Sequence, residues 1–416
     1  MRTVRPINDE ELESFITISA NAYPGLEAFA QSDRIRFRDR LLQAGENPQV
    51  HLYALFEEGQ MRGVMRLYDF TMKFLSTRTV VGGVGGVAVD LLHKKEKIAA
   101  DMLRAFMVHY REKGACLAAL YPFRPDFYQR MGFGHGTKMN SYLFRPGSLP
   151  KGPSKRHVIF LTEYDRDALR ACYDRFLDRS NGLMERFDDV WDAVFADPAL
   201  HIIGVKRSNQ VSGYLIYKFT KGRQNHILSN DILIYEMIYD KSDDLLELVT
   251  FLHSQGDQIE QIIFNTQDES FHYLLQDPRY GSGKLLPQVP YHESNTQGLG
   301  IMYRVIDLPQ LFKILANHNF GDVTCRLKIN LSDSFLPQNA GSTMVGFSEG
   351  RAQLKNEDSY DIAIQMDVSE FSSLVVGAVG FAKLHEYGLA SISDSTYVKV
   401  IDRLFAAPKP ICMTRF

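Results

Sequence analysis

The sequence has few cysteines, and none of them is paired by spacing. Its four cysteines, Cys116, Cys172, Cys325 and Cys412, are widely scattered, and no Cys-x-x-Cys motif is present. This distribution argues against a structural zinc site and a redox dithiol, and it favours reduced thiols. We therefore expect no metal centre.

An excess of one charge and a long apolar segment are also lacking. The 416 residues carry a net charge of −3, which gives no electrostatic case for nucleic acid, a ligand that needs a strongly basic face. Residues 1–6 run directly into the acidic residues 9–11 without an apolar signal core. The longest apolar runs, such as 374–382, fall well short of the roughly 20 residues of a membrane span. We expect a cytoplasmic protein with no membrane span.

The composition is that of an ordinary globular protein. Hydrophobic residues make up 45% and charged residues 23% of the chain, which is long enough for two or three cores. Residues 144–153 hold three prolines and two glycines, a combination that neither a helix nor a strand tolerates. We interpret this stretch as a linker between two folded units.

Apolar periodicity predicts the same order of elements on both sides of the linker. Before it, the order β-α-α-β-β-β-α-β-α is expected at residues 2–6, 8–22, 32–44, 51–56, 61–74, 80–89, 99–112, 115–121 and 125–130. Residues 157–264 repeat this order, and a third unit is expected from Ile301 onward. The sequence thus predicts units of mixed α/β and α+β class at 1–146, 154–295 and 300–416.

Residues 79–136 combine strand, loop and helix signals with groups that could bind a ligand or take part in catalysis. Val87-Ala88-Val89 is short, β-branched and uncharged, which predicts a buried strand that Asp90 ends. Ile98 and Met102 then follow at helical spacing. The turn entering this helix leaves backbone N–H groups unpaired at the positive end of the helix dipole, so it suits a phosphate.

Lys94, Lys95 and Lys97 lie in this turn and would strengthen phosphate binding. Three lysines before a helix are also common on a solvated face, and charge pattern alone leaves this alternative open.

Two segments in a fixed order carry a family resemblance. The stretch from Val87 to Ala99 is followed about thirty residues on by Phe127-Tyr128-Gln129-Arg130-Met131-Gly132-Phe133-Gly134. Together they resemble the GNAT acetyltransferases, and more narrowly the Eis-like (enhanced intracellular survival) branch, over the whole chain. The resemblance implies tandem GNAT folds, each a mixed central sheet flanked by helices, followed by a sterol-carrier-protein-like α+β domain.

The resemblance implies acetyl-CoA as a substrate and places it on particular residues. The strand and the pyrophosphate loop fall on Val87, Ala88, Val89, Lys94, Lys95, Lys97, Ile98 and Ala99. The family loop is Arg/Gln-x-x-Gly-x-Gly/Ala, whereas this sequence reads Lys-x-x-Lys-x-Ala. The Lys97 side chain either blocks the close approach of backbone to phosphate or replaces it with a charge contact.

The second unit lacks these features. Its corresponding turn, residues 239–244, has no glycine and contains three carboxylates, which would repel a pyrophosphate. We expect this copy to bind no CoA and to serve as a scaffold and substrate wall, as the resemblance also implies.

The resemblance assigns the two catalytic roles. The acid falls on Tyr128, whose phenol, with a pKa near ~10, stays protonated at neutral pH, although it could equally be a buried ring bonded to a neighbour. In Eis-like enzymes an aromatic last residue supplies its α-carboxylate as the base, and Phe416 matches. Residues 406–412 form a stiff, largely apolar lead that could dock this tail. His135 is an alternative base.

The acceptor is less defined. Arg415 opposes the polycationic acceptors that the aminoglycoside-modifying members receive, so we do not expect aminoglycosides. Phe29, Phe37, Tyr68 and Phe70 could line an acceptor pocket or could belong to the core.

We therefore expect an acetyl-CoA-dependent N-acetyltransferase that acts on a primary amine of a small-molecule or lysine-type acceptor. The alternative is a non-catalytic binding protein on a GNAT scaffold, with an apolar ligand in the sterol-carrier-protein-like domain. The resemblance also implies a homo-oligomer, commonly a hexamer.

Overall fold

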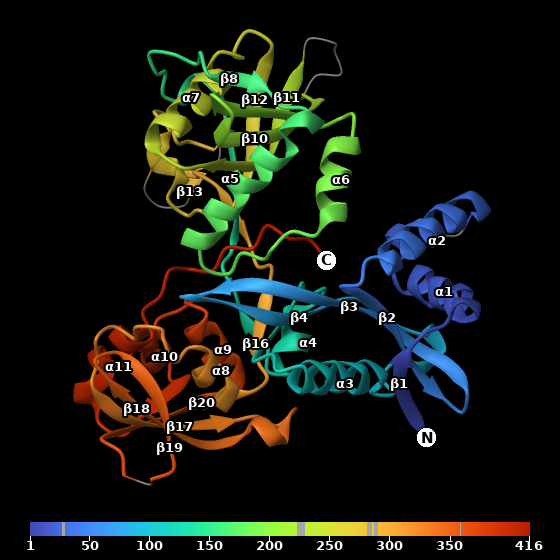
Figure 1. The fold of residues 1–416 in the computed structure, drawn as a ribbon, viewed down its shortest axis with the longest axis vertical. Helices are drawn as coiled ribbons and strands as arrows, with labels where there is room; N and C mark the ends of the chain where they lie inside the picture. The colour runs from blue at the N-terminus through green and yellow to red at the C-terminus, as the bar shows by residue number, and fades with distance from the viewer. Residues whose placement is uncertain (27–29, 223–228, 281–284, 287–289, 358) are drawn as a thin grey trace.

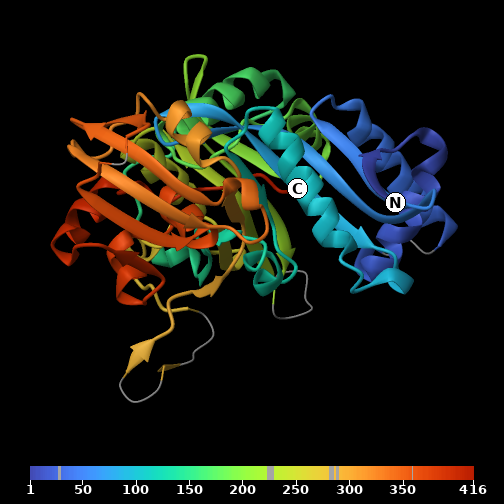
Figure 2. The ribbon, with the colours of Figure 1, turned by 90° about the horizontal axis from the view of Figure 1, so that it is seen from below.

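The computed structural model describes residues 1–416 except 27–29, 223–228, 281–284, 287–289 and 358. The second unit forms one lobe, and the third unit and the α1–α2 region lie at opposite ends of the molecule (Figure 1). Seen from below, α3 runs between these two ends (Figure 2). None of the described helices is long and apolar enough to cross a membrane.

The first sheet has the strand order β1-β2-β3-β4-β5-β16-β6. Its strands are β1 (Arg2–Pro6), β2 (Val50–Glu57), β3 (Gln60–Phe74), β4 (Thr77–Val89), β5 (Leu117–Leu120), β6 (Gly134–His135) and β16 (Met302–Val305). The helices α1 (Leu12–Ala22) and α2 (Gln31–Glu46) pack on one face, and α3 (Ile98–Glu112) packs on the other. Neighbouring strand residues alternate between the faces, as Val64 joins the α1 core and Met65 joins the α3 core. The predicted order of elements is confirmed.

Local sequence signals explain where α1 begins. The Asn8 side chain accepts from the Glu11 backbone N–H at 3.1 Å, and the Glu11 side chain accepts from the Asn8 backbone N–H at 3.0 Å. This reciprocal capping box satisfies two donors that would otherwise be unpaired and opens a single turn that leads into the helix. Residues within four positions of one another therefore fix the start of this segment.

The second sheet repeats the pattern with the strand order β15-β7-β12-β11-β10-β9-β8. The strands are β7 (Met139–Phe144), β8 (Val158–Phe160), β9 (His201–Arg207), β10 (Gln210–Lys221), β11 (Asn230–Tyr239), β12 (Ile259–Thr266) and β15 (Thr296–Gly298). The helices are α5 (Arg166–Arg179), α6 (Asp188–Ala196) and α7 (Ser242–His253), and α5 and α7 pack against separate cores on the two faces. A short hairpin, β13 (Leu285–Leu286) and β14 (Tyr291–His292), precedes β15.

The sheets exchange strands across the expected unit boundaries. β7 precedes residue 146, yet it pairs with β12 of the second sheet. We expected Ile301–Ile306 to open the third unit, but β16 pairs with β5 and β6 and lies inside the first sheet. All four residues of β16 are buried, so the strand gains its place by filling the interior between β5 and β6.

The third unit is a five-stranded sheet with the order β19-β18-β17-β20-β21 and helices on one side. Its strands are β17 (Cys325–Ser332), β18 (Gly341–Ser348), β19 (Arg351–Lys355), β20 (Ile362–Asp367) and β21 (Ala390–Ile392), and its helices are α8 (Leu308–Ile314), α9 (Val368–Val375), α10 (Phe381–Glu386) and α11 (Val398–Leu404). Aromatic rings pack in its interior: Phe320 contacts Phe347 at 5.2 Å between centroids, and Phe371 contacts Phe405 at 5.8 Å. The predicted fold class is confirmed.

Candidate active site

The first feature of the site is a β-bulge in β4. The ladder between β3 and β4 pairs Val64 with Ala88 and Arg66 with Gly85, so Gly86 and Val87 together oppose one residue. Gly86 has φ +58, a conformation that favours glycine. β5 pairs with β4 only as far as Val84. The two parallel strands therefore separate at the bulge and leave an opening in the sheet.

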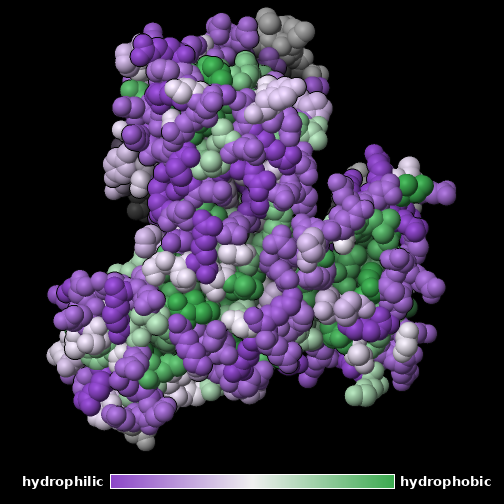
Figure 3. All heavy atoms as spheres, in the orientation of Figure 1, coloured by the Kyte–Doolittle hydropathy of each residue, from purple (hydrophilic) through white to green (hydrophobic). Residues whose placement is uncertain are grey.

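A cavity of about 350 Å³ lies at this opening. It is lined by Phe15, Ser19, Tyr23 and Phe37 from the α1–α2 region, by Arg66 of β3, by residues 84–87 of β4, and by Tyr121, Pro122, Phe123 and Tyr128. Apolar atoms also gather on the inner side of the α1–α2 lobe (Figure 3). Phe37 thus lines the cavity as expected, whereas Phe29 lies outside the described residues. No acidic side chain is among the described residues of this lining.

Tyr128 is the candidate acid, and it borders the cavity. It lies in α4 (Pro125–Gln129), is 3% exposed, and its ring packs edge to face against Phe123, Phe127 and Phe133. Burial raises the pKa of the Tyr128 phenol, and the neighbouring Tyr23 raises it further. The hydroxyl therefore remains a proton donor throughout the physiological range.

Tyr23 is a site residue that the sequence analysis missed. Its hydroxyl donates to the Val87 carbonyl at 2.7 Å, within the bulge. We expected a helix over residues 8–22 and assigned no role to Tyr23 directly after it. The signal that could have identified it is an aromatic residue directly after the first helix, where α1 faces the strand that carries the bulge.

The C-terminal tail connects all three units. Asn181 of the second unit donates to the Pro408 carbonyl at 2.7 Å and accepts from the Ile411 N–H at 2.7 Å. Tyr121 of the first unit then donates to the Thr414 carbonyl at 3.0 Å. The tail ends between the two GNAT lobes (Figure 1).

Aromatic rings hold the last residue. The Phe416 ring lies 4.8 Å from Phe70, 5.3 Å from Tyr121 and 5.5 Å from Tyr68, between centroids. Its carboxyl carbon and oxygen lie 2.9 and 3.3 Å from the position that a Cβ atom on Gly85 would occupy. The terminal carboxyl group is therefore packed against the bulge strand, and a side chain at Gly85 would displace it.

Two charged groups act on the Tyr68 hydroxyl beside this residue. Burial raises the pKa of Tyr68, while Arg66 lowers it and Asp189 raises it. One oxygen of Asp189, in the first turn of α6, is buried and has no hydrogen-bond partner among the described residues. Asp189 is thus a carboxylate whose charge acts on the Tyr68 hydroxyl, and no sequence motif marked it.

The N-terminus of α3, which follows the lysine-rich loop, has no side-chain cap. Lys97 is the N-cap of α3 and has φ 65, and Lys95 has φ 71, both in the left-handed region. The Lys97 side chain makes no capping bond, and Lys94, Lys95 and Lys97 are exposed. The backbone of Lys97 therefore takes a conformation that favours glycine, although the residue is lysine.

The remaining predicted cofactor residues contribute in different ways. Val87, Ala88 and Val89 form the end of β4 beyond its last contact with β5. The Ile98 side chain is 1% exposed and packs in the α3 core, so only its backbone and that of Ala99 face the loop end of the helix.

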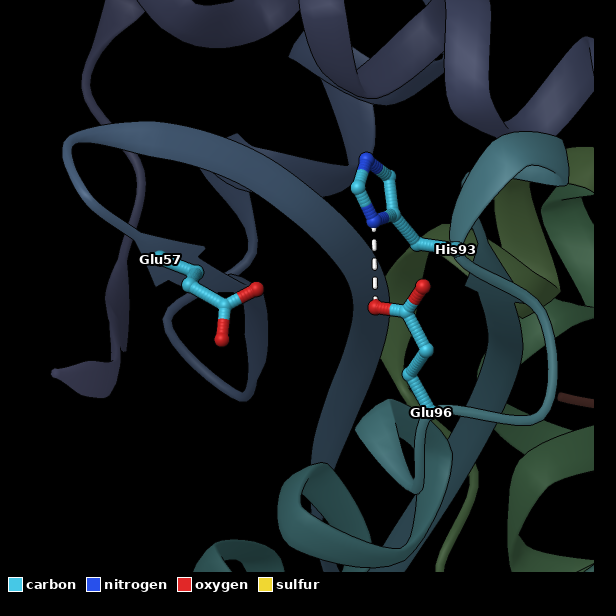
Figure 4. A group of neighbouring side chains, drawn as sticks. All are labelled: Glu57, His93 and Glu96. Carbon is cyan, nitrogen blue, oxygen red and sulfur yellow. Dashed lines mark hydrogen bonds and ion pairs between the residues drawn. The ribbon is translucent and has the colours of Figure 1, made fainter.

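Three ionisable side chains gather beside this loop (Figure 4). One carboxylate oxygen each of Glu57 and Glu96 and one ring nitrogen of His93 lie within 4.8 Å of one another. His93 bonds Glu96 at 3.1 Å, and Arg2 bonds Glu57 at 2.9 Å and the Glu96 carbonyl at 2.8 Å. The hydrogen bond to Arg2 lowers the pKa of Glu57. The cluster therefore ties the loop to β1 through pairs internal to the protein.

The corresponding turn of the second unit is closed. Asp240 bonds Arg175 at 2.7 Å and Arg179 at 3.1 Å. Asp244, in the first turn of α7, pairs with Arg207 and accepts from Ser212 at 2.8 Å. Internal partners thus occupy two of the three carboxylates that the sequence places at this helix end, Asp240 and Asp244.

Other predicted residues lie away from the cavity. His135 lies in the edge strand β6, its carbonyl accepts from Ser373 of α9 at 3.0 Å, and burial lowers its pKa. Met131 and Phe133 are buried in the core. Arg415 is exposed and lies over the Tyr235 ring at 5.6 Å.

The glycine of the Met131-Gly132-Phe133 segment has a structural role. Gly132 has φ +81, and a Cβ atom there would lie 1.4 Å from a guanidinium nitrogen of Arg304. Arg304 is fully buried, donates to the Met131 carbonyl at 2.5 Å, and holds both oxygens of Asp333 at 2.7 and 2.8 Å. This segment therefore joins the first unit to the third.

Three family models match successive parts of the chain. An acetyltransferase (GNAT) domain matches residues 3–136, a second acetyltransferase (GNAT) domain matches residues 182–305, and a sterol carrier protein domain matches residues 311–413. No curated protein sequence matches the chain significantly.

Several solved structures share the whole fold, with 100% of both chains covered. They are a GCN5-related N-acetyltransferase from Anabaena variabilis (TM-score 0.81, 13% identity), one from Kribbella flavida (0.78, 16%) and Eis1 from Mycobacterium abscessus (0.76, 18%). At these identities the likeness establishes the fold. The chain therefore contains two acetyltransferase (GNAT) domains followed by a sterol carrier protein domain, and it shares its fold with Eis1 from Mycobacterium abscessus.

Proposed function

We propose that this protein transfers an acetyl group from acetyl-CoA to a primary amine of a small-molecule or lysine-type acceptor. In this proposal Tyr128 is the general acid and the Phe416 carboxylate is the general base. One observation carries it: the Tyr128 side chain and the Phe416 carboxyl group both reach residues 84–87, where β4 and β5 separate.

The chemistry follows from the placement of these groups. The carboxylate takes a proton from the acceptor ammonium, and the freed amine attacks the thioester carbonyl carbon. As the C–S bond breaks, the departing thiolate takes the phenolic proton of Tyr128, which the buried site keeps available, and the phenolate takes the second proton that the attacking nitrogen loses as the amide forms. Backbone N–H groups at Val87–Val89 would polarise the thioester carbonyl.

The loop before α3 supports the binding of the pyrophosphate. Its helix end has no side-chain cap, and three lysines surround it. Unpaired N–H groups and the positive end of the dipole favour an anion there. We propose that Lys94, Lys95 and Lys97, with the backbone of Ile98 and Ala99, hold the acetyl-CoA phosphates.

A direct test removes the space in which the terminal carboxyl lies. Gly85→Ala should displace Phe416, because the added carbon would lie 2.9 Å from the carboxyl carbon, and kcat should fall by roughly 10². Carboxypeptidase should release Phe416 faster from this variant than from the parent. Gly147→Ala, where nothing lies within 4 Å, is the matched control. A Gly85→Ala enzyme with the parent's rate would contradict the proposal.

Two wider features are part of the proposal. The resemblance implies a homo-oligomer, commonly a hexamer, which light scattering of the purified protein would test. The alternative of an apolar ligand in the sterol carrier protein domain has less support, because rings pack against one another in its interior. Lipid that co-purifies with the protein would favour that alternative.

A further inference from the structure

One charged group in the cavity has no partner within the described residues. The Arg66 side chain lines the cavity beside Tyr23 and Tyr128, and its Nε lies 3.1 Å from the position of a Cβ atom on Gly86. None of the ion pairs or hydrogen bonds of the described chain involves its guanidinium, and no described carboxylate lies within 4.0 Å of it. Arg66 is half-buried.

Several other half-buried arginines each hold a carboxylate, whereas Arg62, also on β3, is an exception whose buried Nε has no partner among the described residues. Arg2 pairs with Glu57 and Asp101, Arg111 pairs with Asp307, and Arg175 pairs with Asp240. A carboxylate partner is the usual arrangement, because its charged hydrogen bonds offset the cost of removing a guanidinium from water. Arg66 departs from it inside the cavity that contains the candidate acid.

The surroundings of Arg66 favour a ligand with a negative charge. Among the described residues, the cavity lining contains this one cation and no acidic side chain. The nearby Asp189 acts on Tyr68 but does not line the cavity. A polycation would have to enter against the Arg66 guanidinium, whereas a monoanion would complement it.

We infer that Arg66 binds an acidic group of the acceptor, so that the preferred acceptor is a primary amine that also carries a carboxylate. This inference rests on the proposed function. A guanidinium can hold a carboxylate through two parallel hydrogen bonds, which orients the bound molecule. With its carboxylate on Arg66, the acceptor can direct its amine toward the opening at the bulge, where the Phe416 carboxyl lies.

Equilibrium binding tests the inference without requiring turnover. Calorimetry would compare ω-amino acids, from 4-aminobutyrate to 6-aminohexanoate, with alkylamines of the same chain length. A charge-assisted contact should make the best amino acid bind about 10- to 100-fold more tightly than its matching alkylamine. Arg66→Gln should reduce that ratio to near one, and Arg66→Lys should retain part of it. Arg156→Gln, an exposed arginine of the second unit, removes the same charge and should leave the ratio unchanged.

Turnover separates this inference from the proposed function. With acetyl-CoA, the ratio of kcat/KM values for the amino acid and the alkylamine should follow the binding ratio in the parent and in each variant. Equal or tighter binding of alkylamines by the parent would overturn the inference, even if acetyl transfer is observed. A ratio that Arg66→Gln leaves unchanged would also overturn it. Absence of acetyl-CoA binding would instead count against the proposed function.

Discussion

The two GNAT domains place the same turn, from a central strand into a helix, in opposite electrostatic settings. In the first domain the turn from β4 into α3 carries exposed lysines, and the N-cap residue Lys97 makes no capping bond. In the second domain the turn from β11 into α7 carries Asp240 and Asp244, and both are held by arginines. One helix end is left for an external anion, and the other is already occupied by the protein.

The short helical segments that follow β5 and β12 differ in the same way. Tyr128 in α4 is 3% exposed and borders the cavity, whereas Tyr273, in the turn at Phe271–Leu274, is 84% exposed. The two domains therefore share the order of strands and helices, but the second domain lacks the lysine-rich turn at the helix N-terminus and the buried tyrosine of the first. The described ring contacts of the C-terminal residue are with Tyr68, Phe70 and Tyr121, all of the first copy.

The largest effect is expected from moving the terminal carboxyl group. Extending the chain beyond Phe416 with a short Gly-Ser tag should lower kcat by roughly 10² to 10⁴, because the base leaves its position. Acetyl-CoA affinity should change little, since the phosphate loop is elsewhere in the first domain. Turnover at the parent's rate from pH 6 to 9 would exclude the carboxylate as base and would direct attention to Asp189 or His135.

The paired tyrosines give the next largest effect. Tyr128→Phe should lower kcat by about 10², because the thiolate loses its proton donor, whereas Tyr273→Phe should have no effect. Because burial raises the pKa of Tyr128, the parent enzyme should show no loss of kcat between pH 7 and 9 from ionisation of this group. Steady-state rates of thiol release across that range would measure both. Equal rates for the parent and Tyr128→Phe would contradict the role of this residue.

The two N-cap lysines sharpen the comparison for the cofactor. Lys97→Gln should weaken acetyl-CoA binding by about tenfold, and more at low salt, because it removes a charge beside the pyrophosphate. Lys241→Gln, at the N-cap of α7, should leave affinity unchanged. Calorimetry should also show one acetyl-CoA per chain. Two sites per chain would show that the second turn is open in spite of its ion pairs.

The smallest expected effect concerns backbone strain in the loop. Lys97→Gly should raise the free energy of unfolding by about 0.5 to 1 kcal/mol, since glycine relieves the positive φ, while acetyl-CoA affinity falls. Lys94→Gly should lower stability, because Lys94 has φ −63. Urea titrations of the two variants would measure the difference. A loss of stability in Lys97→Gly would contradict this account of the loop.

Features that depend on residues close together in the chain could be predicted from the sequence, and features that depend on distant residues could not. The order of elements, the capping box at Asn8 and the lysine-rich turn before α3 were predictable, because each depends on residues within a few positions of one another. The placement of Ile301–Ile306 was not, since β16 entered the first sheet through pairing with β5, which lies far away in the chain.

By itself, the sequence determined which segments are strands and helices, and where the unpaired helix end and the phenol occur along the chain. The tertiary structure alone decided what they face. It brought the Phe416 carboxyl against Gly85, left Arg66 without a described partner in the cavity, and placed Arg304 over Gly132. The physical reason is distance along the chain: such contacts join residues whose separation leaves no periodic pattern, and close packing rather than local propensity selects them.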